Sequence, residues 1–196
     1  FPTRRSSDLG IAVEYGHRLV GVKPKQKRAV FEAISENGPV QVEKEYDLLH
    51  IVPPMRAHAF IGESGLAYVD GPQAGWLEVD KGTLQHRRFS SIFGIGDVTG
   101  VPNSKTGAAI RKQAPVVAAN ALEVLKGKTP TAQYNGYSSC PLVTGVGKVI
   151  LAEFGYDGKL LPSFPLDPTR ERRTMWWLKR YLLAPLYWRG MLAGRF

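Results

Sequence analysis

The chain has 196 residues and carries 26 Lys and Arg against 17 Asp and Glu, which gives a formal net charge of +9 and a pI near 9.7. Its hydrophobic content of 43% is enough for one sizeable core or two small ones, which excludes disorder as the default. The positive charge points to an anionic partner, whether nucleic acid, a membrane surface or a phosphorylated cofactor. With one cysteine, the chain has no internal disulfide and no zinc site built on several thiolates.

The N-terminal third contains short alternating segments. Residues 1–9 show no periodicity, and we expect them to be a non-native or disordered leader. Beyond them, Ile11 to Val22 and Arg28 to Ile34 flank the basic sequence KPKQK, which predicts a hairpin or meander with a solvated lysine turn. The mostly apolar run from Tyr46 to Val52 ends at two prolines and predicts a strand buried on both faces.

The middle of the chain combines turns with one strong helical pattern. Gly62 to Gly82 is rich in turn residues and predicts a connecting excursion, with a short hairpin in the sequence WLEVDKGTLQ. Ile92 to Ile95 predicts a short apolar strand. It leads into a glycine turn at Gly96, with Asp97 at the carboxyl end and a helix from about Ser104 to Leu125.

A strand, a turn, a carboxylate and a helix start in this order can bind a polar ligand. The unpaired N–H groups at the helix start favour electron-rich oxygens, and the carboxylate of Asp97 accepts hydrogen bonds from hydroxyls. The ring carbonyl and ribityl hydroxyl of a flavin would suit these two halves. A purely structural turn is the alternative. In either case we expect Asn103 or Ser104 to cap the helix and Pro115 to bend it.

The single thiol, Cys140, lies in an apolar and turn-rich stretch. Pro141 favours an extended conformation at Cys140, so we expect a stiff corner to aim the side chain. Val149 to Phe154 predicts a strand, and Gly145 and Gly147 permit a close turn before it. A lone cysteine in such a setting is also read as a small buried hydrophobe, and both interpretations remain open.

The C-terminal stretch from Arg170 mixes aromatic and basic residues. Three of the four tryptophans lie here among seven Lys and Arg residues. One broad arc of the helical wheel is apolar, and Pro185 separates a second short segment, which predicts an amphipathic helical hairpin. Such a pair suits the headgroup region of a bilayer, with an ordinary hairpin packed on the domain as the alternative. No apolar run approaches the roughly 20 residues that span a membrane.

Four stretches together resemble the C-terminal half of a sulfide:quinone oxidoreductase, a flavoprotein of the two-dinucleotide-domain disulfide reductase superfamily, in the branch with the mitochondrial enzymes. They are YDLLHIVPPM, the run from DKGTLQHRR to FGIGDVTGVPNSKT, YNGYSSCPLVTGVGKVILAEFGYDGK, and ERRTMWWLK with APLYWRGML. The resemblance implies an α/β fold. It would be a partial two-dinucleotide-binding-domain flavoprotein, a truncated FAD/NAD(P)-binding Rossmann-like fold that ends in the amphipathic helical hairpin.

The same resemblance implies a division of the chain. Residues 10–54 would be the tail of the second nucleotide-binding-like domain, and residues 55–133 the returning part of the FAD-binding domain. Residues 134–196 would form the redox-cysteine and membrane or quinone segment. The family's first redox cysteine and its glycine-rich ADP-binding turn are not among these 196 residues. We therefore expect a fragment that is inactive by itself.

Roles follow from the resemblance residue by residue. Cys140 would be the catalytic residue, one of two redox cysteines that carry sulfur from sulfide as persulfide and reduce FAD through a thiolate-to-flavin charge-transfer adduct. Gly96, Asp97, Lys105 and Thr106 would bind FAD, with Asp97 on the ribityl chain. No metal is implied. The expected quinone and membrane residues are Trp176, Lys179, Leu183, Leu186 and Tyr187.

The implied partners are sulfide, a membrane quinone as electron acceptor and an anionic lipid surface, and a homo-oligomer is compatible with them. The expected location is peripheral, monotopic attachment to the bacterial cytoplasmic membrane or the mitochondrial inner membrane. Nucleic acid is not expected, because the cations are dispersed and carry no recognised binding motif. The alternatives are a type II NADH:quinone reductase, a sulfide dehydrogenase that reduces a cytochrome, and a non-catalytic basic membrane-binding module.

Overall fold

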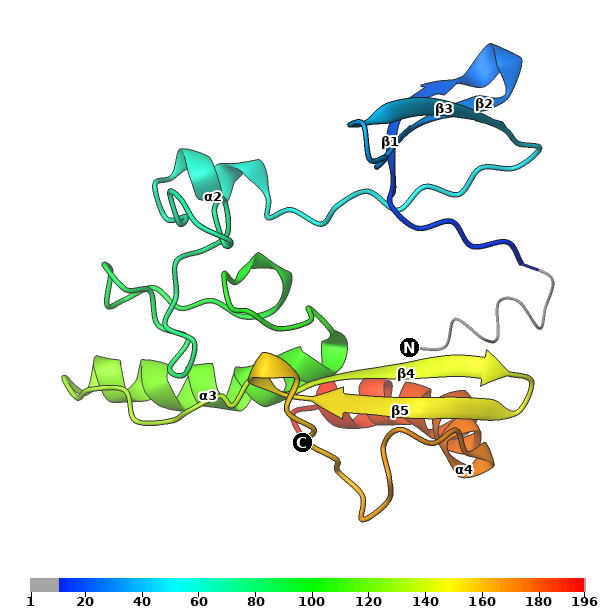
Figure 1. The fold of residues 1–196 in the computed structure, drawn as a ribbon. Helices are drawn as coiled ribbons and strands as arrows, with labels where there is room; N and C mark the ends of the chain where they lie inside the picture. Colours follow the sequence, from blue (N-terminus) through cyan, green and yellow to red (C-terminus); the bar gives the residue numbers. More distant parts are fainter. Residues whose placement is uncertain (1–10, 196) are drawn as a thin grey trace. The chain divides into compact units, whose positions relative to one another are not determined.

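A computed structural model describes residues 11–195, which divide into two compact units, one up to Pro54 and one from Met55 (Figure 1). Each unit is described by itself. The predicted leader, residues 1–9, lies outside the described residues.

The first unit is a three-stranded antiparallel meander in the order β1-β2-β3. Its strands are β1 (His17–Lys23), β2 (Arg28–Ala33) and β3 (Val40–Glu45), and the short 3-10 turn η1 (Pro24–Gln26) joins the first two. Lys27 closes this turn in the left-handed region at φ 50°. The predicted meander around KPKQK is therefore confirmed.

The basic residues of this meander are largely paired across the strands. Arg18 lies opposite Glu32 and forms an ion pair at 2.7 Å, and Arg28 lies opposite Glu45 at 2.8 Å. Lys44 pairs with Glu14 at 2.5 Å. Opposite charges at facing positions stabilise an antiparallel sheet modestly. Its Lys and Arg residues thus have a structural explanation that needs no ligand.

The predicted strand from Tyr46 to Val52 is wrong. Residues 46–58 form neither helix nor strand, and the side chains of Leu48 and Val52 are 87% and 81% exposed. An apolar run is buried as a strand only where neighbouring strands cover it, and among the described residues none pairs with this run. The third strand is instead Val40–Glu45, whose alternating sequence suits an edge strand.

The second unit begins with turns and single bridges packed on a helix. Helix α2 (Ala59–Glu63) leads into the predicted hairpin, which is present as an antiparallel bridge between Val79 and His86. The predicted strand Ile92 to Ile95 is reduced to one bridge, from Phe93 to Gln85, because the chain turns away directly afterwards. The buried hydrophobic residues of this core are Ile61, Ala67, Leu77, Val79, Leu84, Val101, Tyr134 and Tyr137.

Helix α3 (Gly107–Leu125) begins later than predicted and runs through Pro115. Its N-cap is Thr106 instead of Asn103 or Ser104, and the Thr106 Oγ1 accepts a hydrogen bond from the N–H of Ala109 at 3.2 Å. Asn120 fixes the helix near its other end, because its side chain is fully buried and forms hydrogen bonds with the backbone of Thr83 and Ala132. The cap position could not be read from the sequence, since Asn103, Ser104 and Thr106 are all residue types that favour it.

An antiparallel hairpin of β4 (Ser138–Gly145) and β5 (Lys148–Phe154) follows (Figure 1). The predicted strand from Val149 to Phe154 is confirmed, as is the close turn, where Gly147 has a φ of 73°. The predicted extended conformation of Cys140 is confirmed, but Pro141 forms no corner, because both residues lie within β4. A proline suits that position because β4 has a single partner strand, so the missing N–H falls on the open edge.

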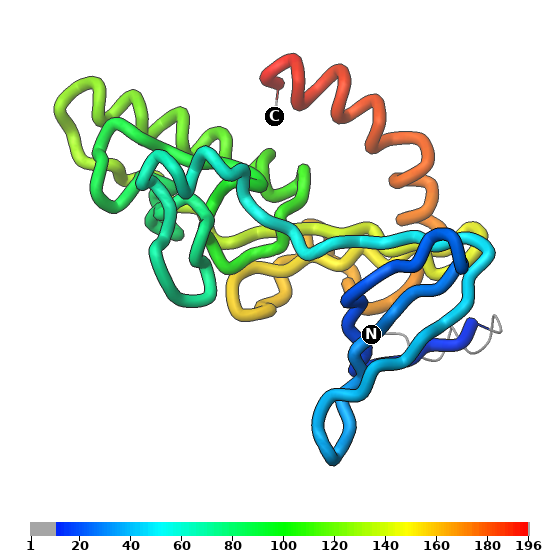
Figure 2. The backbone as a smooth tube through the Cα atoms, turned by 90° about the horizontal axis from the view of Figure 1, so that it is seen from above, coloured from blue at the N-terminus to red at the C-terminus, as the bar shows by residue number. Residues whose placement is uncertain are grey.

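The C-terminal stretch is one continuous helical run, so the predicted helical hairpin is wrong. It comprises α4 (Arg173–Trp177), the π-helical η4 (Leu178–Leu182), α5 (Leu183–Leu186) and the π-helical η5 (Tyr187–Met191). Figure 2 shows it as a single curved helix. Pro185 does not separate two helices, because the wide π turn before it leaves room for the proline ring. Within residues 11–195 no helix is long and apolar enough to cross a bilayer.

Candidate functional site

The turn at η2 (Gly96–Val98) is held rigidly against α3. Gly96 is buried with a φ of 71°, and its N–H donates to the Gln113 Oε1 at 2.7 Å. A Cβ at this position would lie 3.1 Å from the Ile110 Cδ1, so glycine fits both the backbone angle and the space. The Thr99 hydroxyl donates to the carbonyl of Gly96 at 2.8 Å. This fixed turn presents Asp97 to solvent on its outer side.

The start of α3 is bonded directly to the start of β4. The Ser138 hydroxyl is fully buried and donates to the carbonyl of Ser104 at 2.6 Å. It also lies 3.1 Å from the Oγ1 of Thr106, the helix cap. Two segments more than thirty residues apart in the sequence are therefore joined at the helix N-terminus.

The register of the hairpin gives the placement of Cys140. Side chains alternate along a strand, so Cys140 lies on the same face of β4 as Ser138, roughly 7 Å further along. Phe154 is paired with Ser138 and Ala152 with Cys140, and residues directly opposite each other share a face. Cys140 is partly exposed. The thiol thus belongs to the face of the hairpin that meets the start of α3.

An open groove of about 630 Å³ lies beside the helix start. Its wall includes Trp76, Asn103, Lys105 and Phe154. The Lys105 ammonium sits 4.3 Å from the centre of the Trp76 ring, a cation–π contact. Burial lowers the pKa of Lys105, and the negative charge of Asp97 opposes this shift. The groove therefore combines aromatic walls with a partly desolvated cation.

One buried acceptor in this wall has no partner. The Asn103 Nδ2 donates to the Tyr134 hydroxyl at 2.6 Å, and that hydroxyl donates to the carbonyl of Tyr137 at 2.6 Å. The Asn103 Oδ1 is buried without a hydrogen-bond partner among the described residues. An unpaired buried oxygen is costly, so a donor from a ligand or from water would stabilise it.

A buried carboxylate anchors β5 next to Ala152, the residue paired with Cys140. Glu153 is 3% exposed and accepts hydrogen bonds from the Tyr137 hydroxyl at 2.5 Å, the Ser163 hydroxyl at 2.6 Å and the Ser163 N–H at 3.0 Å. Burial raises the pKa of Tyr137, and its bond to Glu153 raises it further. The hydroxyl is therefore retained as a donor at neutral pH, and the strand is held in register.

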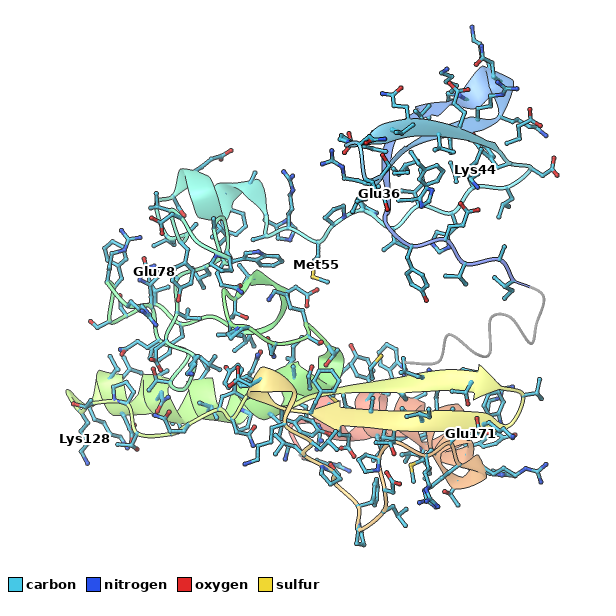
Figure 3. All side chains as sticks on the ribbon, in the orientation of Figure 1. Glu36, Lys44, Met55, Glu78, Lys128 and Glu171 are labelled. Atoms are coloured by element: carbon cyan, nitrogen blue, oxygen red, sulfur yellow. The ribbon has the colours of Figure 1, made fainter. Side chains whose placement is uncertain are left out.

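The helical run is attached to both strands of the hairpin. At its start, the backbone of Arg172 pairs with that of Val149. Glu171, which is labelled in Figure 3, accepts hydrogen bonds from Thr144 at 2.9 Å and from Lys148 at 2.8 Å. Further along, the Lys179 ammonium donates to the carbonyl of Pro141 at 2.8 Å. Among the predicted quinone and membrane residues, Lys179 is the one whose side chain forms a hydrogen bond to β4, the strand that contains Cys140.

The other predicted helical residues expose much of their surface. Trp176 is partly buried, whereas Leu183, Leu186 and Tyr187 are 36%, 39% and 44% exposed. Trp177 and Trp188 were not predicted as site residues, yet they are 61% and 66% exposed. The run therefore presents large apolar side chains to its surroundings.

The structure thus brings Gly96, Asp97, Lys105 and Thr106 to one end of α3, and Cys140 lies further along the β4 face whose Ser138 is bonded there. Sequence reasoning missed Ser138, whose position two residues before the cysteine in an alternating strand was the available signal. It also missed Trp76 and Asn103, for which the sequence carries no local signal, because they reach the groove through the packing of distant turns.

No family model matches this sequence. Three curated relatives carry the name mitochondrial sulfide:quinone oxidoreductase. The protein from Mus musculus is 42% identical over 184 residues, which cover 94% of this chain and 40% of the relative. The one from Dictyostelium discoideum is 39% identical over 203 aligned residues, which cover 100% of this chain and 43% of the relative. The one from Schizosaccharomyces pombe is 43% identical over 183 residues, which cover 91% of this chain and 39% of the relative.

The chain therefore spans about two fifths of the length of the curated relatives that it matches. Among solved structures, it is similar to one chain in a cryo-EM structure of the Tetrahymena thermophila mitochondrial ATP synthase. That likeness has a TM-score of 0.79 and 27% identity, and it covers 98% of this chain and 45% of the other.

Proposed function

From the premise that this chain is homologous to part of the mitochondrial sulfide:quinone oxidoreductases, we propose that it carries one redox cysteine, part of an FAD site and the quinone-facing helix of such an enzyme. The proposed reaction oxidises sulfide at Cys140 and passes the electrons through FAD to a membrane quinone. The observation that carries the proposal is the location of Cys140 on the hairpin face that is bonded to the start of α3.

The residues at this end of the helix fit a flavin. The exposed carboxylate of Asp97 would accept hydrogen bonds from ribityl hydroxyls, and the N-terminal N–H groups of α3 suit ring oxygens. Lys105 would add a positive charge beside them, and the unpaired oxygen of Asn103 offers one further acceptor. When bound, FAD would supply the two-electron carrier between sulfide and quinone.

Thr106 and Gly96 would act through the backbone. Thr106 caps α3 and leaves the N–H of Gly107, the first helical residue, without an intrahelical acceptor, as at any helix start. Gly96 lets the chain turn tightly enough to bring Asp97 near this end, because its φ of 71° favours glycine and a Cβ there would crowd the Ile110 side chain of α3. The rigid turn would hold the carboxylate in one position, which lowers the entropy lost when a cofactor binds.

The relatives support a mixed strand and helix fold of the flavoprotein type, and we extend this to the Rossmann-like assignment. In this proposal residues 10–54 are the tail of the second nucleotide-binding-like domain and residues 55–133 return to the FAD-binding domain. Residues 134–196 form the redox-cysteine and quinone segment. The described strands alone are small antiparallel sheets, so the assignment rests on homology.

The helical run suits the quinone end and a membrane surface. Its large exposed apolar side chains lie among Lys and Arg residues, a composition that favours the interface of an anionic bilayer. Trp176, Leu183, Leu186 and Tyr187 would contribute an apolar wall for the quinone. The proposed location is the surface of the mitochondrial inner membrane, in keeping with the names of the relatives.

The test inserts residues 11–195 into the full-length Mus musculus relative in place of the matching stretch, and introduces Cys140→Ser. We expect sulfide-dependent quinone reduction to fall by at least about a hundredfold, since the nucleophile is lost, while FAD content is unchanged. NADH-dependent quinone reduction is measured in parallel. A variant that keeps its sulfide activity, or a parent protein that oxidises NADH instead, would contradict the proposal and favour a type II NADH:quinone reductase.

A further inference from the structure

We propose that Lys179 is a positioning residue for the sulfur chemistry at Cys140, in that its ammonium is fixed beside the cysteine strand and attracts anionic sulfur species to the thiol. This inference rests on the proposed function. It gives Lys179 a role at the sulfur end, in addition to the quinone-side role that the resemblance implies.

The Pro141 carbonyl points away from β5, towards Lys179. In an antiparallel strand, the N–H and C=O positions of one residue point to the same side. Pro141 has no N–H and is tolerated in β4 because that side is the open edge of the strand. Its carbonyl therefore also points outward, where the Lys179 Nζ donates to it at 2.8 Å. The ammonium is held at the edge of β4 by the residue that follows the cysteine.

The Lys179 ammonium lies close to the thiol of Cys140. The Cys140–Pro141 peptide unit, the Pro141 carbonyl and one hydrogen bond separate the two groups, so the ammonium lies on the order of 7 Å from the Cys140 sulfur. This is within the Debye length of about 8 Å at physiological ionic strength, and the face of β4 that carries Cys140 is partly buried. A unit charge at this distance acts on an anion that approaches the sulfur.

No carboxylate of the described residues neutralises the charge of Lys179 locally. Among the described residues, no carboxylate lies within 4 Å of its ammonium. Glu171, which precedes the helical run, accepts hydrogen bonds from Thr144 and Lys148. The neighbouring cation, Arg180, is 5.8 Å from the centre of the Tyr181 ring and forms no ion pair within the described part of the chain. Of these two cations, Lys179 is therefore the one that a hydrogen bond holds at the edge of β4.

The fixed ammonium acts on the anionic sulfur species that approach Cys140. Hydrosulfide and persulfides are largely anionic near neutral pH, so a fixed cation raises their concentration at the thiol and orients them on one side of β4. The same hydrogen bond attaches the π-helical segment η4 to the hairpin. Movement of the helix would therefore change the charge at the sulfur, and π-helical segments occur often at functional sites.

The experiment uses the complete chain, whose single cysteine makes labelling specific. The reaction rate of Cys140 is measured with dithiobis(nitrobenzoate), which is dianionic, and with dithiodipyridine, which is neutral. Both reagents react with the thiolate, so any change in the thiolate fraction cancels in the ratio of the two rates. The ratio reports the local charge alone. It is measured for the parent chain, Lys179→Met, Lys179→Arg and the matched control Arg180→Met.

We expect Lys179→Met to lower the ratio about threefold at low ionic strength, and the difference to shrink in 1 M salt. Lys179→Arg should keep the parent ratio, and Arg180→Met should change it much less than Lys179→Met. An equal loss for both reagents would mean that Lys179 is purely structural, and an unchanged ratio would overturn the proposal. Folding is checked by circular dichroism. If the methionine variant unfolds, the salt dependence of the parent ratio remains a test, because a ratio that does not change between low and high salt would overturn the proposal.

This outcome is separable from that of the proposed function. If Cys140→Ser leaves sulfide oxidation intact in the full-length form, the enzyme proposal fails whatever the ratio shows. If that variant is inactive and the reagent ratio does not respond to Lys179→Met, only the role of Lys179 is rejected.

Discussion

The two ends of the candidate site are built in opposite ways. At the start of α3, buried polar groups bond one another across long sequence separations, as Ser138 does with Ser104 and Thr106. Along the helical run, by contrast, polar contacts are few and large apolar side chains face outward. The first region is fixed by its own hydrogen bonds, whereas the second has an apolar surface that remains to be covered.

This difference fits a division of labour. A thiol and a cofactor must be held in a narrow range of geometry, which a fully bonded polar network provides. A surface that meets lipid needs apolar area and cations more than internal bonds. Substitutions at the helix end should therefore affect folding stability, and substitutions along the helical run should affect binding to vesicles.

The largest effect on stability is expected for Asn120→Ala. Asn120 is fully buried and makes three hydrogen bonds, to the carbonyls of Thr83 and Ala132 and from the N–H of Ala132. Its loss leaves these backbone groups unpaired, so the free energy of unfolding should fall by about 2–4 kcal/mol. Urea denaturation measures this change. The exposed Lys126→Ala at the end of the same helix is the control and should alter stability by less than about 0.5 kcal/mol.

A smaller loss is expected for Ser138→Ala, which removes the link between β4 and the start of α3. The carbonyl of Ser104 would lose its donor in a buried setting, and the free energy of unfolding should fall by about 1–2 kcal/mol. Denaturation of the variant is compared with Ser91→Ala, an exposed serine. Equal stability of the two variants would mean that the two segments are not joined through Ser138.

Asp80 gives a pH-dependent effect. Hydrogen bonds from the Thr83 N–H, partly opposed by burial, and from the Gly82 N–H lower the pKa of Asp80 below its ordinary value of 3.8. A lowered folded-state pKa adds stability above the unfolded value, and this stability is lost as the pH falls through the folded pKa. Asp80→Asn should cost about 1 kcal/mol at pH 7. The difference from the parent should disappear in acid, and a pH-independent difference would contradict this account.

The smallest effect on stability is expected for Trp177→Ser combined with Trp188→Ser. Both indoles are largely exposed, so the free energy of unfolding should change by less than about 0.5 kcal/mol. Flotation with vesicles that contain anionic lipid should nevertheless fall several-fold, because the apolar area for the bilayer is lost. Leu125→Ser, which removes a residue that is 82% exposed at the end of α3, is the matched control. Similar losses for both would argue against a specific membrane face.

The sequence was informative where the signal is local. The turn chemistry around KPKQK and the apolar strand Val149 to Phe154 were read correctly, because alternation and glycine turns act over a few residues. The helix from Gly107 was also found, although its start was predicted three residues too early. Capping depends on how the candidate side chains are placed, and here the Asn103 amide is bonded to the Tyr134 hydroxyl while the Thr106 hydroxyl caps the helix.

The errors share a cause, which is that tertiary partners override local preference. Tyr46 to Val52 is apolar enough for a buried strand, but no neighbouring strand covers it among the described residues. Pro185 is a helix breaker in isolation, yet a preceding π turn accommodates it. Pro141 suggested a corner, yet an open strand edge accepts it. For Cys140, the neighbours on its face follow from the strand register, which the sequence alone does not fix.

The central claim is that the Cys140 sulfur faces the flavin at the start of α3, and its most direct test is the long-wavelength charge-transfer absorption of a thiolate against a bound flavin. This band requires the two groups to be in contact. In the full-length form that carries residues 11–195, we expect sulfide to produce the band, and Cys140→Ser to abolish it while FAD stays bound. A band of equal strength in the serine variant would contradict the claim.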